Sequence, residues 1–218
     1  MSAIDWYVRP ARREDEAALN RICVATARHG DDVEGEMNIP ALVGAVYSDP
    51  YLRAGAETCR VAAERGTAED KVLGYVVGTY DSRAFETWFR HEYAPARVRE
   101  LNLDGVDAAD DDACANAGLT RLDRDYLRIL RSPGRAPEDL VTDFPAHVHI
   151  NLVARARRLG AGRALMSSFA EGAREAGVPG LHLGAGEDNL RALAFYRAIG
   201  MVEHCRADGV VWMRQPLC

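Results

Sequence analysis

The sequence predicts an α/β protein in which strands and helices pack in layers. From residue 146 onward the pattern alternates strand, helix, strand and helix, and then closes with two strands that can pair as a hairpin. Residues 58–63 and 72–80 are apolar runs separated by the polar segment 64–70, which predicts an antiparallel pair. The length of 218 residues, 48% of them hydrophobic, suits one domain or a domain with a large insertion and can bury an ample core.

The first elements precede that strand pair. Residues 7–9 predict a short strand, which Pro10 ends. Residues 11–27 carry apolar side chains at helical spacing and predict a helix. Residues 41–47 predict a second helix, which ends before Asp49 and Pro50.

Residues 81–145 form a segment of different character. They hold fourteen acidic and nine basic residues, a net charge of −5 out of −6 for the whole chain. Helical pieces are expected at 83–101 and 120–130, joined by the aspartate-rich run 104–112. Two interpretations stay open, a solvated surface loop with flanking helices or a functional lid.

The elements after residue 146 are more regular. Residues 147–153 alternate polar and apolar side chains up to Leu152, as a strand with one buried face does. Residues 162–176 place apolar side chains on one helical face, and Gly177 ends that helix. The remaining predicted elements are a strand at 181–183, a helix at 189–199, and a hairpin of 201–205 with 210–213.

A glycine-bearing turn follows the strand at 147–153 and opens the helix at 162–176. Helix starts expose unpaired N–H groups and partial positive charge, so they attract phosphate. Glycine removes side chains where a diphosphate would touch the main chain. Such glycines can also serve only a tight turn, and arginines often lie on solvated helix faces. We interpret the segment as a diphosphate cradle, made by Arg157, Arg158, Leu159, Gly160, Ala161, Gly162, Arg163 and Ala164, with Arg155 beside it.

A second group of polar residues lies in the helix expected at 189–199. Asn189 and Tyr196 are seven residues apart, nearly two helical turns, which places them on the same face. An amide can hydrogen-bond an amide-rich ligand, and a phenol can give up a proton. An aromatic side chain at such a position also serves commonly as core.

Together the two segments resemble the GNAT superfamily of N-acetyltransferases. The family's R/Q-x-x-G-x-G/A loop is matched by residues 157–162, and its N-x-x-A-x-x-x-Y element by Asn189, Ala192 and Tyr196. The resemblance is close over residues 146–214 and looser over 7–80. It implies one domain, 1–218, with a GNAT-like mixed, mostly antiparallel central sheet flanked by helices. The helical, acidic insertion 81–145 then lies between the third and fourth strands.

A narrower similarity is carried by residues 145–152 and by aromatic residues of the insertion, Phe85, Trp88 and Tyr93. These resemble bacterial acetyltransferases related to the acetyltransferase-like C-terminal region of O-GlcNAcase. Two positions depart from that pattern. Asn151 stands where Asp is expected, which removes a carboxylate base, and Ala154 stands where Pro is common.

The resemblance implies acetyl-CoA (coenzyme A) as cofactor and a direct transfer of its acetyl group to a primary amine, on a small molecule or a protein lysine. Main-chain groups at Leu152 and Val153 would bind the pantetheine arm, and Tyr196 would protonate the departing thiolate. His149 is the first candidate for the base and His147 the second, since an imidazole pKa near 6.5 suits proton uptake at neutral pH. Both histidines could equally be ordinary hydrogen-bonded residues. The acidic run 104–112 could attract cationic amines to the acceptor pocket.

Several classes of protein are disfavoured by composition. The net charge of −6 disfavours a nucleic-acid binder. The sequence contains no apolar run of about 18 residues, so no membrane span is expected. Residues 1–5 lack signal-peptide character, and five scattered cysteines without a C-x-x-C pair indicate reduced thiols, a cytoplasmic location and no metal site. A homodimer stays open, as does the alternative function of a module that binds acetyl-CoA, or has lost it, and acts through protein contacts.

Overall fold

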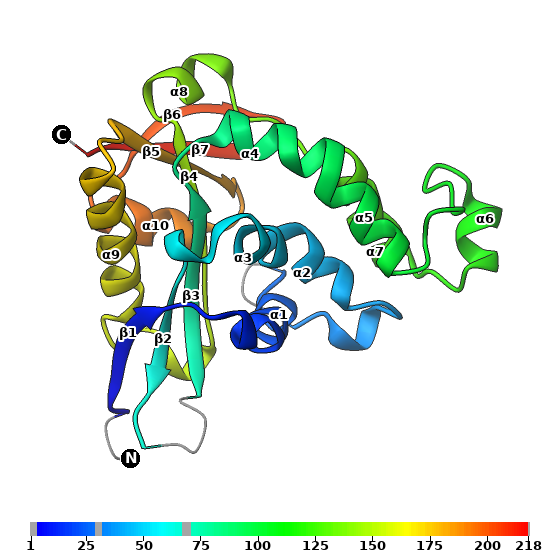
Figure 1. Ribbon diagram of the computed structural model, residues 1–218, viewed down its shortest axis with the longest axis horizontal. Helices are drawn as coiled ribbons and strands as arrows, with labels where there is room; N and C mark the ends of the chain where they lie inside the picture. Colours follow the sequence, from blue (N-terminus) through cyan, green and yellow to red (C-terminus); the bar gives the residue numbers. More distant parts are fainter. Residues whose placement is uncertain (1–3, 29–31, 67–70, 218) are drawn as a thin grey trace.

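The structure is a computed structural model that describes residues 4–28, 32–66 and 71–217. These residues form one sheet of seven strands in the order β1-β2-β3-β4-β5-β7-β6 (Figure 1). The β4–β5 pair is parallel and the other five pairs are antiparallel, which confirms the mixed, mostly antiparallel sheet. The strands are β1 (Trp6–Pro10), β2 (Arg60–Glu64), β3 (Val72–Thr79), β4 (Ala146–Leu152), β5 (Gly180–Gly186), β6 (Val202–Ala207) and β7 (Val210–Pro216).

Helices cover both faces of the sheet (Figure 1). Alternate side chains of a strand point to opposite faces. Tyr75 and Val77 of β3 accordingly pack into one apolar cluster with the N-terminal helices, and Val76 packs into a second cluster with the C-terminal ones. The first face carries α1 (Glu16–Val24), α2 (Ala41–Tyr47) and α3 (Asp49–Gly55), and the second carries α9 (Ala161–Glu175) and α10 (Leu190–Ala198).

The helix α9 follows the sequence pattern closely. Leu165, Phe169 and Ala173, spaced four apart, are fully buried against the sheet. Gly177 has a left-handed φ of +73°, and the N–H of Val178 donates to the carbonyl of Ala173 at 2.9 Å, which closes the helix end. The predicted helix at 162–176 is therefore confirmed within one residue at each end.

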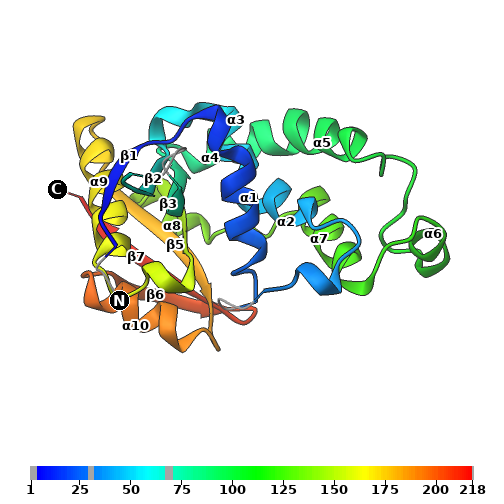
Figure 2. The ribbon, with the colours of Figure 1, turned by 90° about the horizontal axis from the view of Figure 1, so that it is seen from below.

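The insertion lies between β3 and β4, as predicted, and is helical. It extends away from the sheet, with its aspartate-rich part near α6 at the far end (Figure 2). A capping box at Thr120 and Asp123 starts its longest helix. Its helices are α4 (Ser82–Trp88), the π-helical turn η4 (Phe89–Tyr93), α5 (Ala94–Glu100), α6 (Asp111–Asn116), α7 (Arg121–Arg131) and α8 (Glu138–Asp143).

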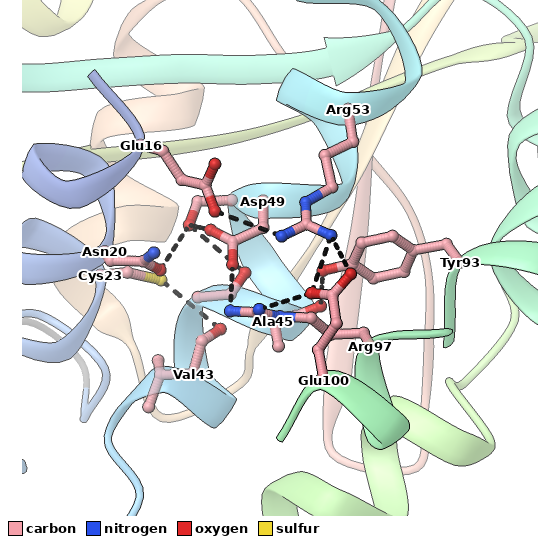
Figure 3. A network of polar contacts seen from close by, with 12 residues as sticks. Glu16, Asn20, Cys23, Val43, Ala45, Asp49, Arg53, Tyr93, Arg97 and Glu100 are labelled. Carbon is pink, nitrogen blue, oxygen red and sulfur yellow. Dashed lines mark hydrogen bonds and ion pairs between the residues drawn. The ribbon is translucent and has the colours of Figure 1, made fainter. Parts of the chain in front are cut away.

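A buried ion pair joins the insertion to the N-terminal helices (Figure 3). The Asp49 side chain, at the start of α3, is fully buried and accepts from Nη2 of Arg97 on α5 at 3.0 Å. Burial raises the pKa of Asp49, and the Arg97 guanidinium opposes that shift. The hydroxyl of Tyr93 donates to the carbonyl of Ala45 on α2 at 2.9 Å. Arg97 and Tyr93 of the insertion thus donate hydrogen bonds to polar groups that lie beneath the insertion.

A second buried carboxylate makes a similar connection further along. Asp123 on α7 is fully buried, and its oxygens accept from the backbone N–H groups of Asn38 and Ile39, each at 3.0 Å. The same carboxylate accepts from the N–H of Thr120 at 2.9 Å. The segment before α2 is thereby fixed to the insertion by hydrogen bonds to a charged group, which are stronger than neutral ones.

Some boundaries differ from the predictions for physical reasons. The helix predicted at 41–47 ends before Asp49 and Pro50 as expected, but a further helix, α3, begins there with Pro50 in its first turn, where the missing N–H costs no helix hydrogen bond. The first helix starts at Glu16, after a short 3-10 turn, η1 (Arg13–Asp15). The strand predicted at 181–183 extends to Gly186, because β7 pairs with it throughout.

Three expectations fall partly outside the described residues: the polar turn at 64–70, of which 67–70 lie outside, the sequence start, of which 1–3 lie outside, and the set of five cysteines, of which Cys218 lies outside. Among the residues that the structure describes, no helix is both long enough and apolar enough to cross a bilayer.

Removing Arg97, the partner of the buried Asp49 carboxylate, should destabilise the fold markedly. Arg97→Ala leaves the Asp49 carboxylate buried without its partner, which costs about 3–5 kcal/mol in the free energy of unfolding. Arg28→Ala breaks the exposed pair with Glu36, whose side chains are about half exposed, and should lower the free energy of unfolding far less. Urea unfolding at pH 7 compares the two variants. Equal, small losses would mean that the insertion is held without the Asp49–Arg97 pair.

Candidate active site

The candidate site lies where β4 and β5 separate. The two strands pair over two residues each, and the last pair is His147 with His182. β4 continues to Leu152 beside β3, and β5 continues to Gly186 beside β7. Each strand keeps one paired edge while its other edge faces a space, here named the β4–β5 gap. Backbone groups on such edges can hydrogen-bond an added ligand.

The predicted phosphate loop lies at the end of β4. A 3-10 turn, η5 (Ala154–Ala156), leads into it, and α9 begins at Ala161. Gly160, just before α9, has a left-handed φ of +85° and is exposed, and the nearest atom that an added Cβ would meet is Cζ2 of Trp6 at 3.9 Å. Arg158 is also left-handed, with φ of +62°. Glycine at 160 therefore supplies a required conformation, and it leaves the start of α9 open.

Gly162 has a packing role that the sequence did not predict. A Cβ there would lie 3.2 Å from Cζ of Phe195 and 3.5 Å from Cδ1 of Leu152. Both of these side chains pack against the core on the α9 face. The absence of a side chain at 162 thus lets α10 and the end of β4 approach the first turn of α9.

The arginines around the loop have different surroundings. Arg155 pairs with Glu64 at 2.7 Å, and Nη2 of Arg163 donates to the carbonyl of Ala198 at 2.9 Å. Arg158 is exposed beside Gly160. Arg158 is therefore a suitable position at which to test the predicted phosphate loop.

The helix α10 begins directly after Asn189 and includes Tyr196, and the expectation that the two share one face stays a prediction. Asn189 precedes the helix as its N-cap, and its side-chain oxygen accepts from the N–H of Ala192 at 3.2 Å. Tyr196 lies within the helix and packs, 8% exposed, in the core on the α9 face. Burial raises the pKa of Tyr196 to about 12, so the phenol is protonated at neutral pH.

His147 has both ring nitrogens occupied. The hydroxyl of Ser82 donates a hydrogen bond to the carbonyl of Pro145 at 2.6 Å. The Ser82 oxygen therefore accepts a hydrogen bond from the protonated Nδ1 of His147 at 2.7 Å. Nε2 then accepts from the hydroxyl of Tyr51 at 2.9 Å. Burial lowers the pKa of His147 well below its usual range. The imidazole of His147 is therefore neutral and is held in place by its two hydrogen bonds.

His149 lies two residues along the same face of β4. Its ring contacts those of Tyr47 and Tyr51, with centroids 5.4 Å apart in each case. Burial lowers its pKa to about 4, so the imidazole is neutral at pH 7 and can accept a proton. Its surroundings are aromatic, and a base here works in an apolar setting.

His182 on β5 was not predicted as a site residue. Its Nδ1 lies 2.6 Å from the carbonyl of Phe144, which can only accept, so Nδ1 carries the proton. Nε2 is then the ring's acceptor. Burial lowers the pKa of His182, which keeps this imidazole neutral as well. Among the described residues, no group of three or more His, Cys, Asp or Glu side chains could hold a metal ion.

A cavity of about 380 Å³ adjoins the β4–β5 gap on the face of the three histidines. The aspartates of 104–112 are all described, and none of them lines it, so the expected attraction of cationic amines has no direct contact to act through. The sequence showed no sign of this cavity, because its walls come from distant segments. They include Tyr47 and Tyr51, Phe85 and Phe89 of the insertion, residues 133–136, and Gly184 and Trp212 of the sheet.

Comparisons with known proteins agree with this geometry. The model of the Acetyltransferase (GNAT) family matches residues 134–201. The crystal structure of SsHAT has a TM-score of 0.85 and 28% identity, with 98% of each chain covered. A structure of yncA from Salmonella typhimurium with its cofactor acetyl-CoA has a TM-score of 0.51 and 14% identity, covering 98% of this chain and 95% of that one.

The fold is therefore that of the GNAT acetyltransferases, and residues 134–201 match that family in sequence as well. Protein O-GlcNAcase of Rattus norvegicus is 20% identical over 204 residues, 94% of this chain. The chain spans only 21% of that relative, about a fifth of its length. The two resemblances inferred from the sequence are confirmed.

The buried, neutral imidazoles should make stability depend on pH. In the unfolded chain His149 has a pKa near 6.5, and in the fold about 4, so the unfolded state takes up its proton first on acidification. The free energy of unfolding should fall from pH 7 to pH 5, with on the order of 1–2 kcal/mol of the fall due to His149.

Urea unfolding of His149→Gln at pH 7, 6 and 5 checks this prediction, because that share of the fall should disappear. His91→Gln changes an exposed histidine and should keep the dependence of the unaltered protein. If the free energy of unfolding of both variants falls with pH as steeply as that of the unaltered protein, burial of His149 contributes nothing to acid sensitivity.

Proposed function

We propose that the protein is an acetyl-CoA-dependent N-acetyltransferase that moves an acetyl group to a primary amine by direct attack in a ternary complex. The observation that carries this proposal is the β4–β5 gap. It begins beside the open start of α9 and ends at the His147–His182 pair, on the wall of the cavity. An elongated ligand lying in the gap would place its diphosphate at one end and its thioester at the other.

The chain's own groups fit such a ligand. The exposed Gly160 and the first turn of α9, a helix of fifteen residues, offer N–H groups and the positive end of a helix dipole. The free edge of β4 offers main-chain groups for the amide-bearing arm. We assign cofactor binding to Leu152, Val153, Arg157, Arg158, Leu159, Gly160, Ala161, Gly162, Arg163, Ala164, Asn189 and Tyr196.

Acid and base would act from opposite faces of the sheet. Acetyl-CoA, when bound, supplies an acyl carbon with a thiolate leaving group. Tyr196 lies on the α9 face and stays protonated at neutral pH, so we assign it the donation of a proton to the departing sulfur. His149 lies on the cavity face with a neutral ring, and we assign it the removal of the amine's proton.

His147, the second candidate for the base, would first have to release Tyr51 or Ser82. We therefore assign His147 a positioning role, in which its hydrogen bond keeps Tyr51 in place at the cavity. Proton transfer of this kind is worth roughly 10²–10⁴-fold in rate, while holding amine and thioester together supplies up to about 7–11 kcal/mol. Positioning should thus dominate, which suits a weak base such as His149.

The alternative of a module that binds acetyl-CoA and acts only through protein contacts is not favoured. Such a module needs the phosphate loop alone. Here the loop is accompanied by a protonated tyrosine, a neutral histidine and a cavity for a second ligand.

Charge reversal at the loop should weaken cofactor binding. Arg158→Glu places a carboxylate beside the open start of α9 and should raise the Kd for acetyl-CoA by at least about tenfold, more at low salt than at high salt. Arg121→Glu makes the same change at an exposed position on the insertion and should leave the Kd unchanged. Titration calorimetry measures both. Equal affinities would rule out the cradle at residues 157–164.

Loss of the phenol should slow turnover and spare binding. Tyr196→Phe should lower kcat by about 10²-fold with a saturating primary amine, since the thiolate must then leave without a nearby acid. The Kd for acetyl-CoA should stay within about twofold of the unaltered value. Release of free CoA thiol gives the rate. An unchanged kcat would remove Tyr196 from the acid role, and no thiol release by the unaltered protein with any primary amine would refute the proposed activity.

A further inference from the structure

The cavity beside the β4–β5 gap has a size and enclosure suited to a small molecule. Pockets for small ligands typically measure about 300–1,000 Å³, and this one measures about 380 Å³. Its walls come from α2 and α3, from α4 and η4, from residues 129–136, and from the sheet. The insertion therefore covers the acceptor side of the gap.

Flat rings form two parts of the wall, one from the helices over the sheet and one from the sheet itself. Tyr51 and Phe85 are stacked, with centroids 4.5 Å apart and planes at 8°. Phe89 lies 6.0 Å from Phe85 and extends that surface. Trp212 of β7 contributes a further ring from the sheet. A flat apolar body gains most from such surfaces, because aromatic rings favour contacts at 4.5–7 Å.

A glycine in the sheet gives Trp212 its place. Gly184 of β5 is the cross-strand partner of Trp212. A Cβ at 184 would lie 3.1 Å from Cζ3 of Trp212 and 2.9 Å from Cγ1 of Val210. The indole therefore rests directly on the backbone of β5, and a side chain at 184 would push it toward the cavity.

The lining is poor in negative charge. Its charged side chains are Glu86, Arg90 and Arg135, and Nε of Arg135 lies 3.2 Å from the carboxylate of Glu86. Burial keeps the imidazoles of His147 and His149 neutral. One carboxylate against two guanidinium groups disfavours a ligand with several positive charges.

We propose that the acceptor is a monoamine whose amino group is carried on a flat, uncharged ring body, with the ring packed against the aromatic lining that Tyr51, Phe85 and Trp212 contribute. This inference rests on the proposed function and narrows its acceptor. The single amino group then reaches the gap beside His149, and the ring fills the apolar part of the cavity. Polyamines, aminoglycosides and protein lysines lack either the flat body or the low charge.

Rates of CoA thiol release with four amines test the proposal. 2-Phenylethylamine should give a kcat/KM at least about fivefold above those of n-butylamine, spermidine and a lysine-containing peptide. This comparison uses the unaltered protein, so it does not depend on how any variant folds. A preference for spermidine or the peptide would overturn the proposal.

Variants at the ring wall sharpen the test. Trp212→Ala should raise the KM for 2-phenylethylamine by about three- to tenfold and that for n-butylamine by less than about twofold. Gly184→Ala should act in the same direction by displacing the indole. Tyr80→Ala removes an aromatic ring that does not line the cavity and packs against Phe169 on the other face of the sheet, so it should affect both amines equally. Equal effects of Trp212→Ala on the two amines would count against the ring site.

The two levels of failure can be told apart. If acetyl-CoA gives no heat of binding in calorimetry, the proposed function fails. If acetyl-CoA binds and thiol is released only with amines that lack a ring, the proposed function stands and the inferred acceptor class fails. If acetyl-CoA binds and no ring amine releases thiol, the acceptor class fails as well.

Discussion

The site depends on one constraint, the short contact between the two parallel strands at the centre of the sheet. β4 and β5 can part after His147 and His182 because each keeps a full ladder with its other neighbour, β3 or β7. Little pairing is lost, and two strand edges remain with main-chain groups that a ligand can satisfy. The predicted phosphate loop lies at one end of the opening and the histidines at the other, which is the arrangement that the proposed transfer from cofactor to acceptor requires.

The insertion links electrostatics to the shape of the site. Its negative charge is concentrated far from the cavity, near α6, while its two buried carboxylate contacts hold it against the N-terminal helices. That docking brings Phe85 over Tyr51 and completes the apolar wall. The two interpretations left open by the sequence, a solvated surface loop with flanking helices or a functional lid, both stay predictions.

Local patterns in the sequence were sufficient to predict much of the fold. Apolar spacing gave α9 within a residue at each end, and the two glycines with Asn189 and Tyr196 indicated the family. The continuation of β5 through Gly184 and Gly186 could not be foreseen, because glycine has little intrinsic preference for strands and the pairing with β7 holds it. The tautomer of His182 and the ring wall of the cavity also depend on contacts between residues far apart in the chain. For the same reason, the candidate base could be named but its protonation could not.

The ties between the insertion and the N-terminal helices have a consequence for the order of folding. The bond from Asp123 to Asn38 joins residues 85 positions apart, and that from Arg97 to Asp49 joins residues 48 apart. Closing such long loops costs entropy before any contact repays it. We expect helices α1–α3 to lack their cover until the ribosome has released most of the insertion. Their exposed apolar surface would meanwhile be a target for chaperones, and the acceptor cavity would be among the last parts of the molecule to form.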